Sequence, residues 1–538
     1  MGKVVGIDLG TTFSVVAYID NNGNPKVLHN REGDVTTPSA VLFLDDEVLV
    51  GKEAKRNGVS NPQNYVSEIK RNIGNRNFVF RNELNEEYSS EAITAIILKK
   101  IKEDAELALG DTIEGAVITV PAYFYDEDRT ATKNAAKIAG INVLGIINEP
   151  TAAAIAYGLE KSNNKSTNIM VYDLGGGTFD VSIVNITDTK INILGSDGTR
   201  VLGGCDFDKK IIEYVLAEAS KKGIDITNDK IAMQSLCLAA EEAKKSLSAS
   251  SKARITVNCN GIPLMVTITK EQFEQMIDPL LYDTTVFMNS AMEEANLDYS
   301  ELDKILLVGG STRIPAVTEY IKTESDGIIP SSDIHPDEAV AIGAAYYAVN
   351  ICKNSESKPE KEDIYLPNSE KKDIPNVNNR LQEPSIKNDI DLPSSLKSYD
   401  FVERTSHGIG VVIEEKGVEK NKVVLPKNSI VPASSTMMFT TLGNYQEIIV
   451  LEVTEGQDDD VRFVKIIGST ELKVKPKKHK VDIEISISYD KDSCIHIRVR
   501  DVEDNEDLGE MEIIHKNNLS DGEIRNEQTR IGKLNIGD

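Results

Sequence analysis

The chain has 538 residues, 40% of them hydrophobic, and a formal net charge of -26 from 60 Lys and Arg against 86 Asp and Glu. This length predicts two or three packed domains, and the acidic charge argues against nucleic acid or an anionic membrane as the main partner. The five cysteines are scattered without a CxxC pair, which argues against a disulfide framework or a zinc site. We read no basic-apolar leader and no stretch of about 20 apolar residues, and therefore expect a cytoplasmic protein without a membrane partner.

Two aspartate-glycine turns recur in the first half of the chain, DLGTT at 8–12 and DLGGGT at 173–178. Each follows an apolar run and precedes a β-patterned run, so each predicts a strand-turn-strand hairpin. Backbone N–H groups of such turns can approach phosphate oxygens, and threonine hydroxyls can add contacts. The pair predicts two phosphate clamps around one nucleotide, formed by Gly10, Thr11, Thr12 and Phe13 and by Gly175, Gly176, Gly177 and Thr178.

An aspartate ends the first strand of each predicted hairpin. Asp8 and Asp173 would meet one Mg²⁺ from opposite sides, through its waters, because Mg²⁺ gives up its hydration shell reluctantly. A single turn of this kind is more often an ordinary tight hairpin, and the second copy, together with the motifs that follow, is what favours a nucleotide site.

A buried strand is predicted at 116–121, followed by a helix that has Asp126 or Asp128 as its N-cap and that ends at Gly140. The next strand leads into NEPTAAA at 148–154. Because Pro150 restricts the residue before it, we expect Glu149 to be extended just before a new helix. Its carboxylate would project toward a cleft, as a ligand of metal-bound water or as a proton relay.

Two further patterns lie in the second half of this region. Glu241, Lys244, Lys245 and Ser248 recur at helical spacing, which by itself predicts only a solvated helix face. A third glycine turn at Gly309 and Gly310 follows a strand and opens a helix, where a planar adenosine could lie against bare backbone.

The chain changes character after residue 350. Residues 351–400 are mainly Lys, Glu, Asp, Asn, Ser and Pro, and we interpret them as a disordered polar linker. Residues 401–515 contain period-2 strands, including 447–454, 461–467, 481–489, 495–499 and 510–514, which predict an all-β antiparallel sandwich. Residues 516–538 predict a short helical stub with Ser520 or Asp521 as N-cap.

Five further motifs occur in order: VPAYF at 120–124, INEPTAAA at 147–154, LGGCDFD at 202–208, GGSTRIP at 309–315 and PDEAVA at 336–341. With the two turns, they closely resemble the heat-shock protein 70 family of chaperones over residues 1–350. One glycine turn alone would also fit actins or sugar kinases. The resemblance implies an α/β actin-like ATPase domain, duplicated and ribonuclease-H-like, at 1–350, with a peptide-binding type of β domain at 401–515 and a truncated lid remnant at 516–538.

The resemblance also implies a cleft that holds ATP or ADP with Mg²⁺, and K⁺ beside them. Asp8, Glu149 and Asp173 would organise the metal and its waters. Lys70 would place the attacking water and the γ-phosphate, and Asp180 would be an acidic neighbour of that water. From spacing alone Lys70 reads as a surface lysine. The other expected nucleotide contacts are Gly203, Gly204, Glu241, Lys244, Lys245, Ser248, Gly309, Gly310, Ser311, Arg313 and Asp337.

The β domain resembles the same family more faintly. By that resemblance Phe439, Leu442, Ile448 and Ile449 would line a groove for extended apolar peptide, and the alternative for these residues is sandwich core. The family implies unfolded polypeptide clients and a nucleotide-exchange factor as partners.

Three departures from the family pattern bear on mechanism. A segment at 400–407, behind about fifty polar residues, replaces the short acidic-leucine linker, which puts coupling between ATP and peptide in doubt. Gly145 replaces an arginine at which J-domain co-chaperones engage, so a J-domain partner is doubtful. The helical lid is nearly missing, so bound peptide should dissociate quickly.

Two classes of function follow. The first is an ATP-dependent chaperone that binds extended apolar segments of unfolded clients. The second is a nucleotide-gated adaptor or regulator that uses the β domain for one dedicated partner. A small-molecule kinase is disfavoured by the appended β domain.

Overall fold

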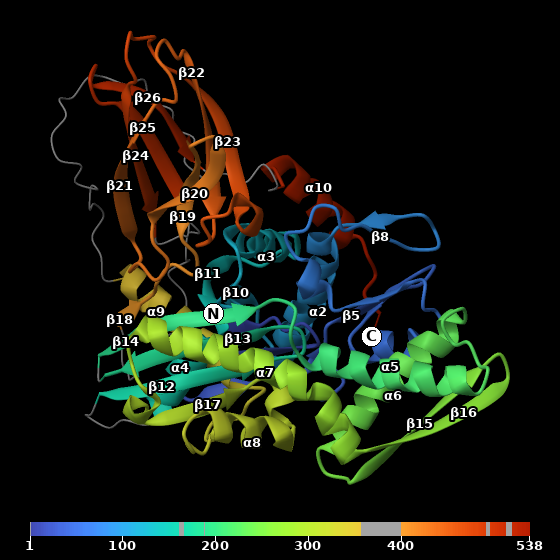
Figure 1. Cartoon of the computed structure of the whole chain (residues 1–538). Coiled ribbons are helices and arrows are strands. Elements are labelled where there is room, and N and C mark those ends of the chain that lie inside the picture. The colour runs from blue at the N-terminus through green and yellow to red at the C-terminus, as the bar shows by residue number, and fades with distance from the viewer. Residues whose placement is uncertain are drawn as a thin grey trace.

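The structure is a computed structural model that describes residues 2–160, 166–187, 189–356, 400–490, 495–512 and 519–537. A large α/β part formed by the first 356 residues carries a β-rich part on one side (Figure 1). Most of the predicted linker, residues 357–399, lies outside the described residues. None of the described helices is both long and apolar enough to span a bilayer.

The first sheet has the order β11-β10-β1-β2-β3. Strands β1 (Lys3–Asp8) and β2 (Phe13–Ile19) form an antiparallel hairpin around the first glycine turn, and β10 (Ile113–Val120) and β11 (Val143–Asn148) add in parallel. The edge strand is β3 (Pro25–Val27). The first strand-turn-strand prediction is confirmed.

The second sheet repeats this plan in the order β17-β12-β13-β14-β18. Strands β12 (Thr167–Leu174) and β13 (Phe179–Ile186) form the hairpin of the second turn, with β17 (Lys304–Val308) parallel to β12 and β14 (Lys190–Thr199) antiparallel to β13. The second hairpin prediction is also confirmed. Strand β18 (Asp400–Val402), which follows the predicted linker, adds in parallel to β14.

Two alanine-rich helices, α4 (Glu149–Glu160) and α9 (Ala339–Glu356), share one core with side chains from both sheets. Their small side chains let the backbones approach closely. A Cβ on Gly343 would lie 1.8 Å from the Ala152 carbonyl oxygen, so only glycine fits at this crossing. This contact fixes the angle at which the two sheets face each other, and with it the two glycine turns.

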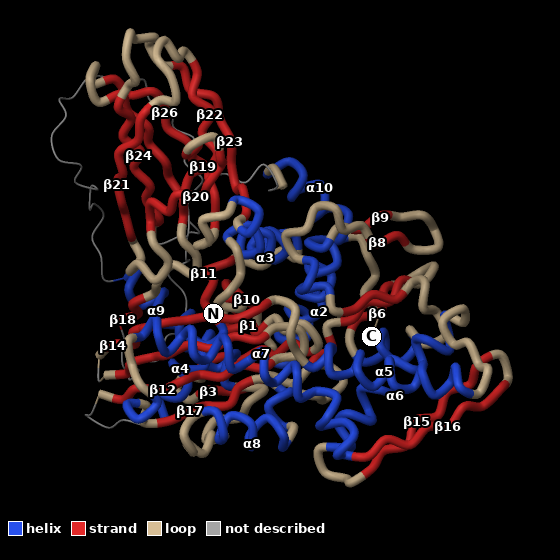
Figure 2. The backbone as a smooth tube through the Cα atoms, viewed as in Figure 1, coloured by secondary structure: helices blue, strands red, loops and turns tan. Residues whose placement is uncertain are grey.

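Each of these two sheets is the centre of one lobe, and the remaining elements of the α/β part pack around the two lobes (Figure 2). They are β4 (Thr37–Pro38), β5 (Ala40–Phe43), β6 (Val48–Val50), α1 (Lys52–Asn57), β7 (Tyr65–Ser67), the 3-10 turn η1 (Ile69–Asn72), β8 (Phe80–Arg81), β9 (Glu87–Tyr88), α2 (Ser90–Leu109), α3 (Asp126–Ile138), α5 (Gly204–Lys221), α6 (Lys230–Leu247), β15 (Lys252–Cys259), β16 (Ile262–Thr269), α7 (Lys270–Ala295), η2 (Tyr299–Glu301), η3 (Gly310–Arg313) and α8 (Pro315–Glu324).

Two helix boundaries differ from the sequence prediction. The N-cap of α3 is Tyr125, and Asp128 sits three residues later, where its Oδ2 accepts the Tyr125 N–H at 3.0 Å. The prediction that Asp126 or Asp128 caps this helix was wrong, because both lie inside its first turn. Glu149 is the first residue of α4 rather than an extended residue before it, since Pro150 is tolerated in a first turn.

The β-rich part consists of two four-stranded antiparallel sheets that share one apolar core. The first has the order β20-β19-β22-β23 and the second β21-β24-β25-β26. Their strands are β19 (Ile409–Glu415), β20 (Val418–Leu425), β21 (Ala433–Thr440), β22 (Ile448–Glu455), β23 (Lys465–Lys473), β24 (Asp482–Tyr489), β25 (Ile495–Asp501) and β26 (Glu506–Glu512).

One strand prediction in this part was partly wrong. Residues 461–463 form a 3-10 turn, η4 (Val461–Phe463), and the strand begins only at Lys465. Asp460 stops the strand from starting earlier because its side chain accepts the N–H of Arg462 at 3.0 Å. The end of the strand predicted at 510–514 lies outside the described residues from 513 onward.

In addition to the pairing of strand β18, side chains of the β-rich part contact the α/β part. His407 lies between two tyrosine rings of the first lobe, with centroid distances of 4.6 Å to Tyr123 and 4.4 Å to Tyr125. Lys427 pairs with Glu294 at 2.5 Å. These contacts join the β-rich part to the turn between β10 and α3 in the first lobe and to α7 in the second.

The last helix, α10 (Asp521–Gly532), packs on α2 and α3 of the first lobe (Figure 1). Ser520 is its N-cap, as predicted, and forms a capping box with Glu523. Ile524 and Ile531 are buried in the core that α2 and α3 share. Beyond the helix, Val48 of β6 donates to the Asn535 carbonyl at 2.9 Å and accepts from Gly537 at 3.0 Å.

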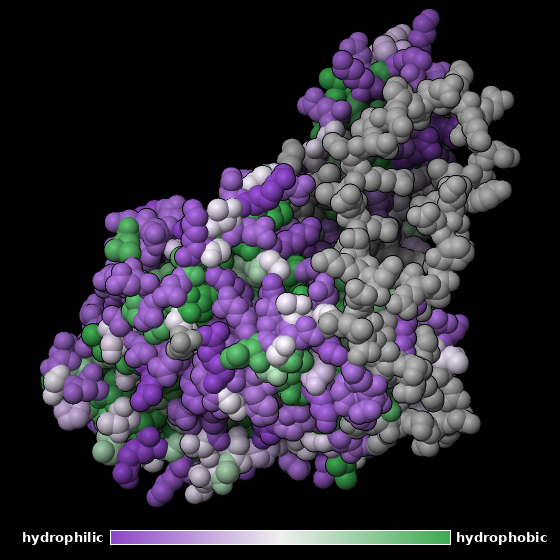
Figure 3. All heavy atoms as spheres, turned by 180° about the vertical axis from the view of Figure 1, so that it is seen from behind, coloured by the Kyte–Doolittle hydropathy of each residue, from purple (hydrophilic) through white to green (hydrophobic). Residues whose placement is uncertain are grey.

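The molecular surface is mainly hydrophilic, with apolar residues scattered in small groups, on the face shown in Figure 3. This distribution accords with the excess of acidic residues in the sequence.

Candidate functional site

A cavity of about 600 Å³ lies between the two lobes. Most of the sequence-predicted nucleotide and metal residues line it: Asp8, Gly10, Thr11, Thr12, Phe13, Lys70, Glu149, Asp173, Gly175, Gly176, Thr178, Glu241, Lys244, Lys245, Ser248, Gly309, Gly310, Ser311, Arg313 and Asp337. Asp180, Gly177, Gly203 and Gly204 are the predicted residues that do not line the cavity, and Asp180 is the cross-strand neighbour of Asp173, which does line it.

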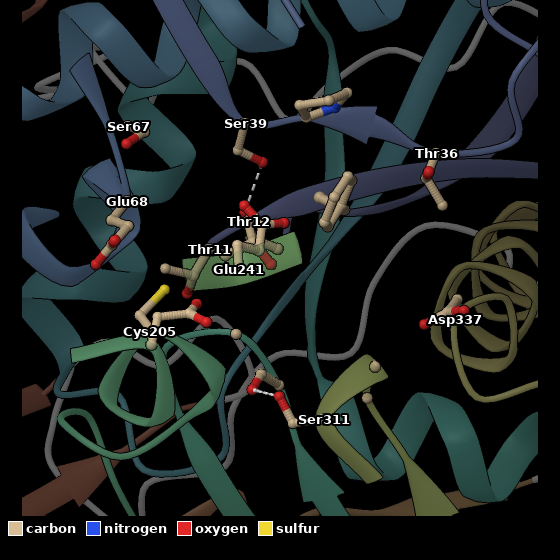
Figure 4. A pocket seen from close by; sticks show the side chains of 18 of the residues that line it. Thr11, Thr12, Thr36, Ser39, Ser67, Glu68, Cys205, Glu241, Ser311 and Asp337 are labelled. Carbon is tan, nitrogen blue, oxygen red and sulfur yellow. Dashed lines mark hydrogen bonds between the residues drawn. The ribbon is translucent and has the colours of Figure 1, made fainter. Parts of the chain in front are cut away.

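The two glycine turns face each other across this cavity. A Cβ on Gly176 would lie 2.3 Å from the Thr12 hydroxyl oxygen, and a Cβ on Gly177 would lie 2.5 Å from the Thr11 methyl carbon. Side chains at these two positions would therefore push the turns apart, so glycine is required for the close approach. Figure 4 shows Thr11 and Thr12 among the side chains that line the cavity.

The carbonyl groups of the second turn are held from behind by the protein. The Gly175 carbonyl accepts from the Gly204 N–H at 3.0 Å and the Ser311 hydroxyl at 2.8 Å, and the Gly176 carbonyl accepts from the Cys205 N–H at 2.8 Å. No backbone carbonyl among the described residues accepts from the N–H groups of residues 176–178. These N–H groups are thus free to bind an anion, as phosphate-binding turns do.

The first turn is held in the same way by one serine that the sequence analysis did not single out. The Ser39 hydroxyl donates to the Gly10 carbonyl at 2.8 Å, and its N–H donates to the Thr12 carbonyl at 2.9 Å (Figure 4). A serine after Pro38 carries no sequence signal for this role, because the contact depends on strand β4 lying beside the turn.

Four buried carboxylates gather at the inner end of the cavity. Asp8 ends β1, Asp173 lies near the end of β12, Asp180 is on β13 and Glu149 begins α4. Lys70 forms an ion pair with Glu149. Among these groups the protein therefore supplies one positive charge for four carboxylates.

This excess of negative charge shifts the carboxylate pKa values. Burial, and then repulsion from Glu149, raise the pKa of Asp8 to about 7 and that of Asp180 to about 7. The same causes raise the pKa of Asp173 well above its ordinary value. Asp8 accepts a hydrogen bond from Thr119 at 3.1 Å. Such a cluster of oxygen donors with uncompensated charge suits a hard divalent cation such as Mg²⁺.

No three His, Cys, Asp or Glu side chains in the described part of the chain converge closely enough to hold a metal ion by themselves. A cation among the four carboxylates would thus keep water molecules as ligands. K⁺ stays a prediction.

The outer end of the cavity is charged and partly aromatic. Glu241 on α6 pairs with Lys55 on α1 at 2.5 Å and with Lys245 at 2.8 Å. Burial opposes ionisation of Glu241, but the two lysines outweigh it and lower its pKa to about 2. Both ammonium groups lie over the Phe13 ring, at 5.2 and 5.3 Å from its centroid. Lys55 joins the two lobes, and sequence reasoning missed it.

The third glycine turn closes the cavity on the side of the second lobe. Arg313 donates to Asp337 at 2.6 Å, and the Asp337 carboxylate lies 3.3 Å from the Cβ position of Gly310. Ser311 connects this turn to the second phosphate turn through the Gly175 carbonyl. The three predicted glycine turns thus form one continuous surface.

Cys205 also lines the cavity, although the sequence analysis assigned it no site role. Burial raises the pKa of its thiol, which disfavours the thiolate that reacts as a nucleophile.

The four residues predicted to bind peptide divide into two pairs. Phe439 and Ile449 pack partly buried against the core shared by the two sheets, which was the alternative role for them. Leu442 and Ile448 are 55% and 48% exposed. The structure thus leaves the second pair accessible to a ligand.

Gly145 lies on β11, facing α9. A Cβ there would be 3.2 Å from Ile351 and 3.6 Å from Tyr347. The space beside Gly145 is narrow, so the arginine of the family pattern would have to displace these side chains.

A duplicated α/β fold with two facing glycine turns, a buried carboxylate cluster and a cavity between its lobes is the arrangement expected of a nucleotide-binding protein. The family model described as "Hsp70 protein" matches residues 4–364. The match covers more than half of the sequence, and the chain belongs to the Hsp70 family. This family has an actin-like ATPase domain, binds nucleotide with Mg²⁺ and acts on unfolded polypeptides, so membership supports a chaperone- and ATPase-type function for this chain.

Proposed function

We propose that this chain is an ATP-dependent chaperone that binds and slowly hydrolyses ATP, and thereby controls the binding of extended apolar segments of unfolded clients. The observation that carries the proposal is the pair of facing phosphate turns beside four buried carboxylates and Lys70. Positioning and charge neutralisation are the main requirements of phosphoryl transfer, and this cavity offers both.

The residues have distinct proposed roles. Asp8, Glu149 and Asp173 would hold Mg²⁺, and bound Mg²⁺ would supply charge neutralisation for the phosphates. Lys70, held by Glu149, places the γ-phosphate and the attacking water. Asp180, whose Oδ1 accepts the Tyr123 N–H at 3.0 Å, orients that water from a fixed position.

Direct contact between the two parts supports coupling despite the long linker. Tyr123 donates its N–H to Asp180 in the ATPase cleft, and its carbonyl lies 3.4 Å from His407 Nε2 at the start of the β-rich part. A displacement of Asp180 on hydrolysis would therefore be transmitted to His407 through Tyr123. An unstructured tether alone transmits little strain, whereas packed side chains do.

The proposed client site is the exposed end of the β-rich part, with Leu442 and Ile448 as contacts. Helix α10 packs on the first lobe, so it does not cover this end. Client exchange should be fast, and the protein would act as a short-lived holder of apolar segments. A nucleotide-exchange factor is a proposed partner.

The alternative is a nucleotide-gated adaptor with one dedicated partner. Gly145 favours it, because the chain lacks at this position the arginine with which J-domain proteins are expected to engage. The location is proposed to be cytoplasmic.

Single-turnover ATP hydrolysis by the full chain, with and without Lys70→Ala, tests the proposed activity. We expect the variant to bind ATP but to hydrolyse it about a hundredfold more slowly, because one charge-stabilising group is lost. Lys52→Ala, which removes an exposed lysine of the same lobe that pairs with Asp34, is the matched control and should hydrolyse normally. Equal rates in all three proteins would exclude the role of Lys70.

A further inference from the structure

Arg71, the residue after Lys70, makes four hydrogen bonds from the first lobe to the second, and no role described so far explains them. Its Nε and Nη2 donate to the Gly177 carbonyl at 3.1 and 2.9 Å. Nη1 donates to Asp206 at 3.3 Å, and Nη2 forms a second, closer bond to the same carboxylate. Arg71 does not line the cavity.

The contact is enclosed by protein. The Arg71 and Asp206 side chains are only 13% and 15% exposed. A bidentate arginine-carboxylate pair in such a setting is geometrically specific and much stronger than an exposed pair. Although burial opposes it, the bonds from Arg71 and Lys209 lower the pKa of Asp206, so the carboxylate stays charged.

The backbone around Arg71 is held in an unusual conformation. Glu68, which precedes η1, has φ of 56°, in the left-handed region that non-glycine residues rarely adopt. The short 3-10 turn that follows presents consecutive side chains to different sides. Lys70 reaches Glu149 at the carboxylate cluster, whereas Arg71 reaches the back of the second phosphate turn.

The contact with Gly177 completes the support of that turn. The carbonyls of Gly175 and Gly176 are already held by backbone and hydroxyl donors of the second lobe. The Gly177 carbonyl is held by Arg71, from the first lobe. Because a trans peptide is planar, fixing the Gly177 carbonyl on one side directs the Thr178 N–H to the opposite side. Thr178 lines the cavity.

We propose that Arg71 is a positioning residue that orients the second phosphate turn toward the polyphosphate of the bound nucleotide and clamps the lobes around it. The inference rests on the proposed function, since it assigns Arg71 to the phosphate half of the same cavity. Arg71 touches neither the nucleoside half nor the four carboxylates directly, so its effect is confined to phosphate binding and to the geometry of hydrolysis.

The test compares the binding of ADP and of adenosine to the full chain with Mg²⁺ present, by calorimetry. We expect Arg71→Met, which keeps the length of the side chain, to weaken ADP by about tenfold or more, as loss of a bidentate charged contact does. Adenosine affinity should change less than about twofold. A merely structural role would weaken both ligands together.

Two further variants keep the outcome interpretable. Arg71→Lys retains the charge but cannot donate to Gly177 and Asp206 as a fork, so it should recover only part of the ADP affinity and should fold as the parent chain does. Arg81→Met removes an exposed arginine of the same lobe and should leave both affinities unchanged.

The outcomes separate the two proposals. If the unchanged chain binds neither ligand, the proposed nucleotide site itself is wrong. If it binds ADP and Arg71→Met binds ADP equally well, or loses ADP and adenosine to the same extent, the positioning role of Arg71 is overturned while the nucleotide site stands.

Discussion

At the scale of single residues, the nucleotide cavity depends on the glycines of its turns and on the hydrogen-bond donors that hold the carbonyl groups of these turns. The second turn approaches the first because Gly176 and Gly177 lack a Cβ, and each turn is fixed through its carbonyls. The turns themselves could be predicted because their glycines stand in a compact motif. Ser39 and Arg71 could not, since they act 29 and 106 positions away from the carbonyls they hold.

Gly176→Ala tests the close approach of the turns. The new methyl group would meet the Thr12 hydroxyl at 2.3 Å, so the turns must separate and the phosphate N–H groups move apart. We expect ADP affinity to fall by at least about tenfold. Gly532→Ala, in α10, is a control for the effect of adding a methyl group at a glycine, because nothing lies within 4 Å of its Cβ position and its φ is not positive. Unchanged ADP affinity in Gly176→Ala would contradict the geometry of the cavity.

At the scale of elements, the sequence predicted that helix α10 exists, but it did not predict the surface on which the helix packs. Ser520 and the polar pattern predicted the helix and its start. Its packing partners, α2 and α3, lie hundreds of residues earlier, and two buried isoleucines give no signal for which surface they cover. Lys99 of α2 completes the contact by donating to the Ile531 and Leu534 carbonyls at 3.2 and 3.1 Å, which satisfies the end of the helix.

Ile531→Ala tests whether α10 is a permanent part of the first lobe. Ile531 is fully buried, so truncation should lower the free energy of unfolding by about 2 to 5 kcal/mol and the midpoint of thermal unfolding with it. Ile329→Ala, at a site that is 71% exposed, should change it by no more than about 0.5 kcal/mol. If both variants unfold like the parent chain, α10 does not stay on the first lobe in solution.

At the scale of the whole molecule, the long polar linker predicted two separate domains, whereas the structure brings them into contact. Phe401 lies 5.1 Å from the Tyr347 ring on α9, and the strand that contains it joins the second sheet. Three residues of strand at the end of a polar stretch are too short for a periodicity argument. The contact therefore follows from tertiary packing and not from local pattern.

The pH dependence of this docking tests the role of His407. Burial between the two tyrosines lowers the pKa of His407 to about 3, so docking requires the neutral ring. The docking free energy is nearly constant above pH 6.5, which is the ordinary pKa of a free histidine. Below this pH it becomes less favourable, by about 1.4 kcal/mol between pH 7.5 and 5.5, because protonation of His407 favours the undocked state. Glu403 and Glu455 act in the opposite direction, because burial raises their pKa values.

His407→Leu isolates the histidine contribution, since both glutamates remain in the variant. Hydrogen exchange at the Asp400 N–H, which donates to the Thr189 carbonyl at 2.9 Å, reports docking. Exchange at this site should accelerate on acidification more in the parent chain than in His407→Leu, after correction for the intrinsic rate. The same acceleration in both would show that His407 does not titrate at this interface.

The central claim is that ATP in the cleft controls peptide binding by the β-rich part. The most direct measurement is the dissociation rate of a labelled apolar peptide from the full chain, by fluorescence anisotropy, with ATP and Mg²⁺ against ADP and Mg²⁺. We predict faster release with ATP, and a return to slow release that fails in Lys70→Ala because hydrolysis is blocked. Equal rates with both nucleotides would contradict the coupled chaperone and favour an adaptor whose β-rich part acts independently of ATP.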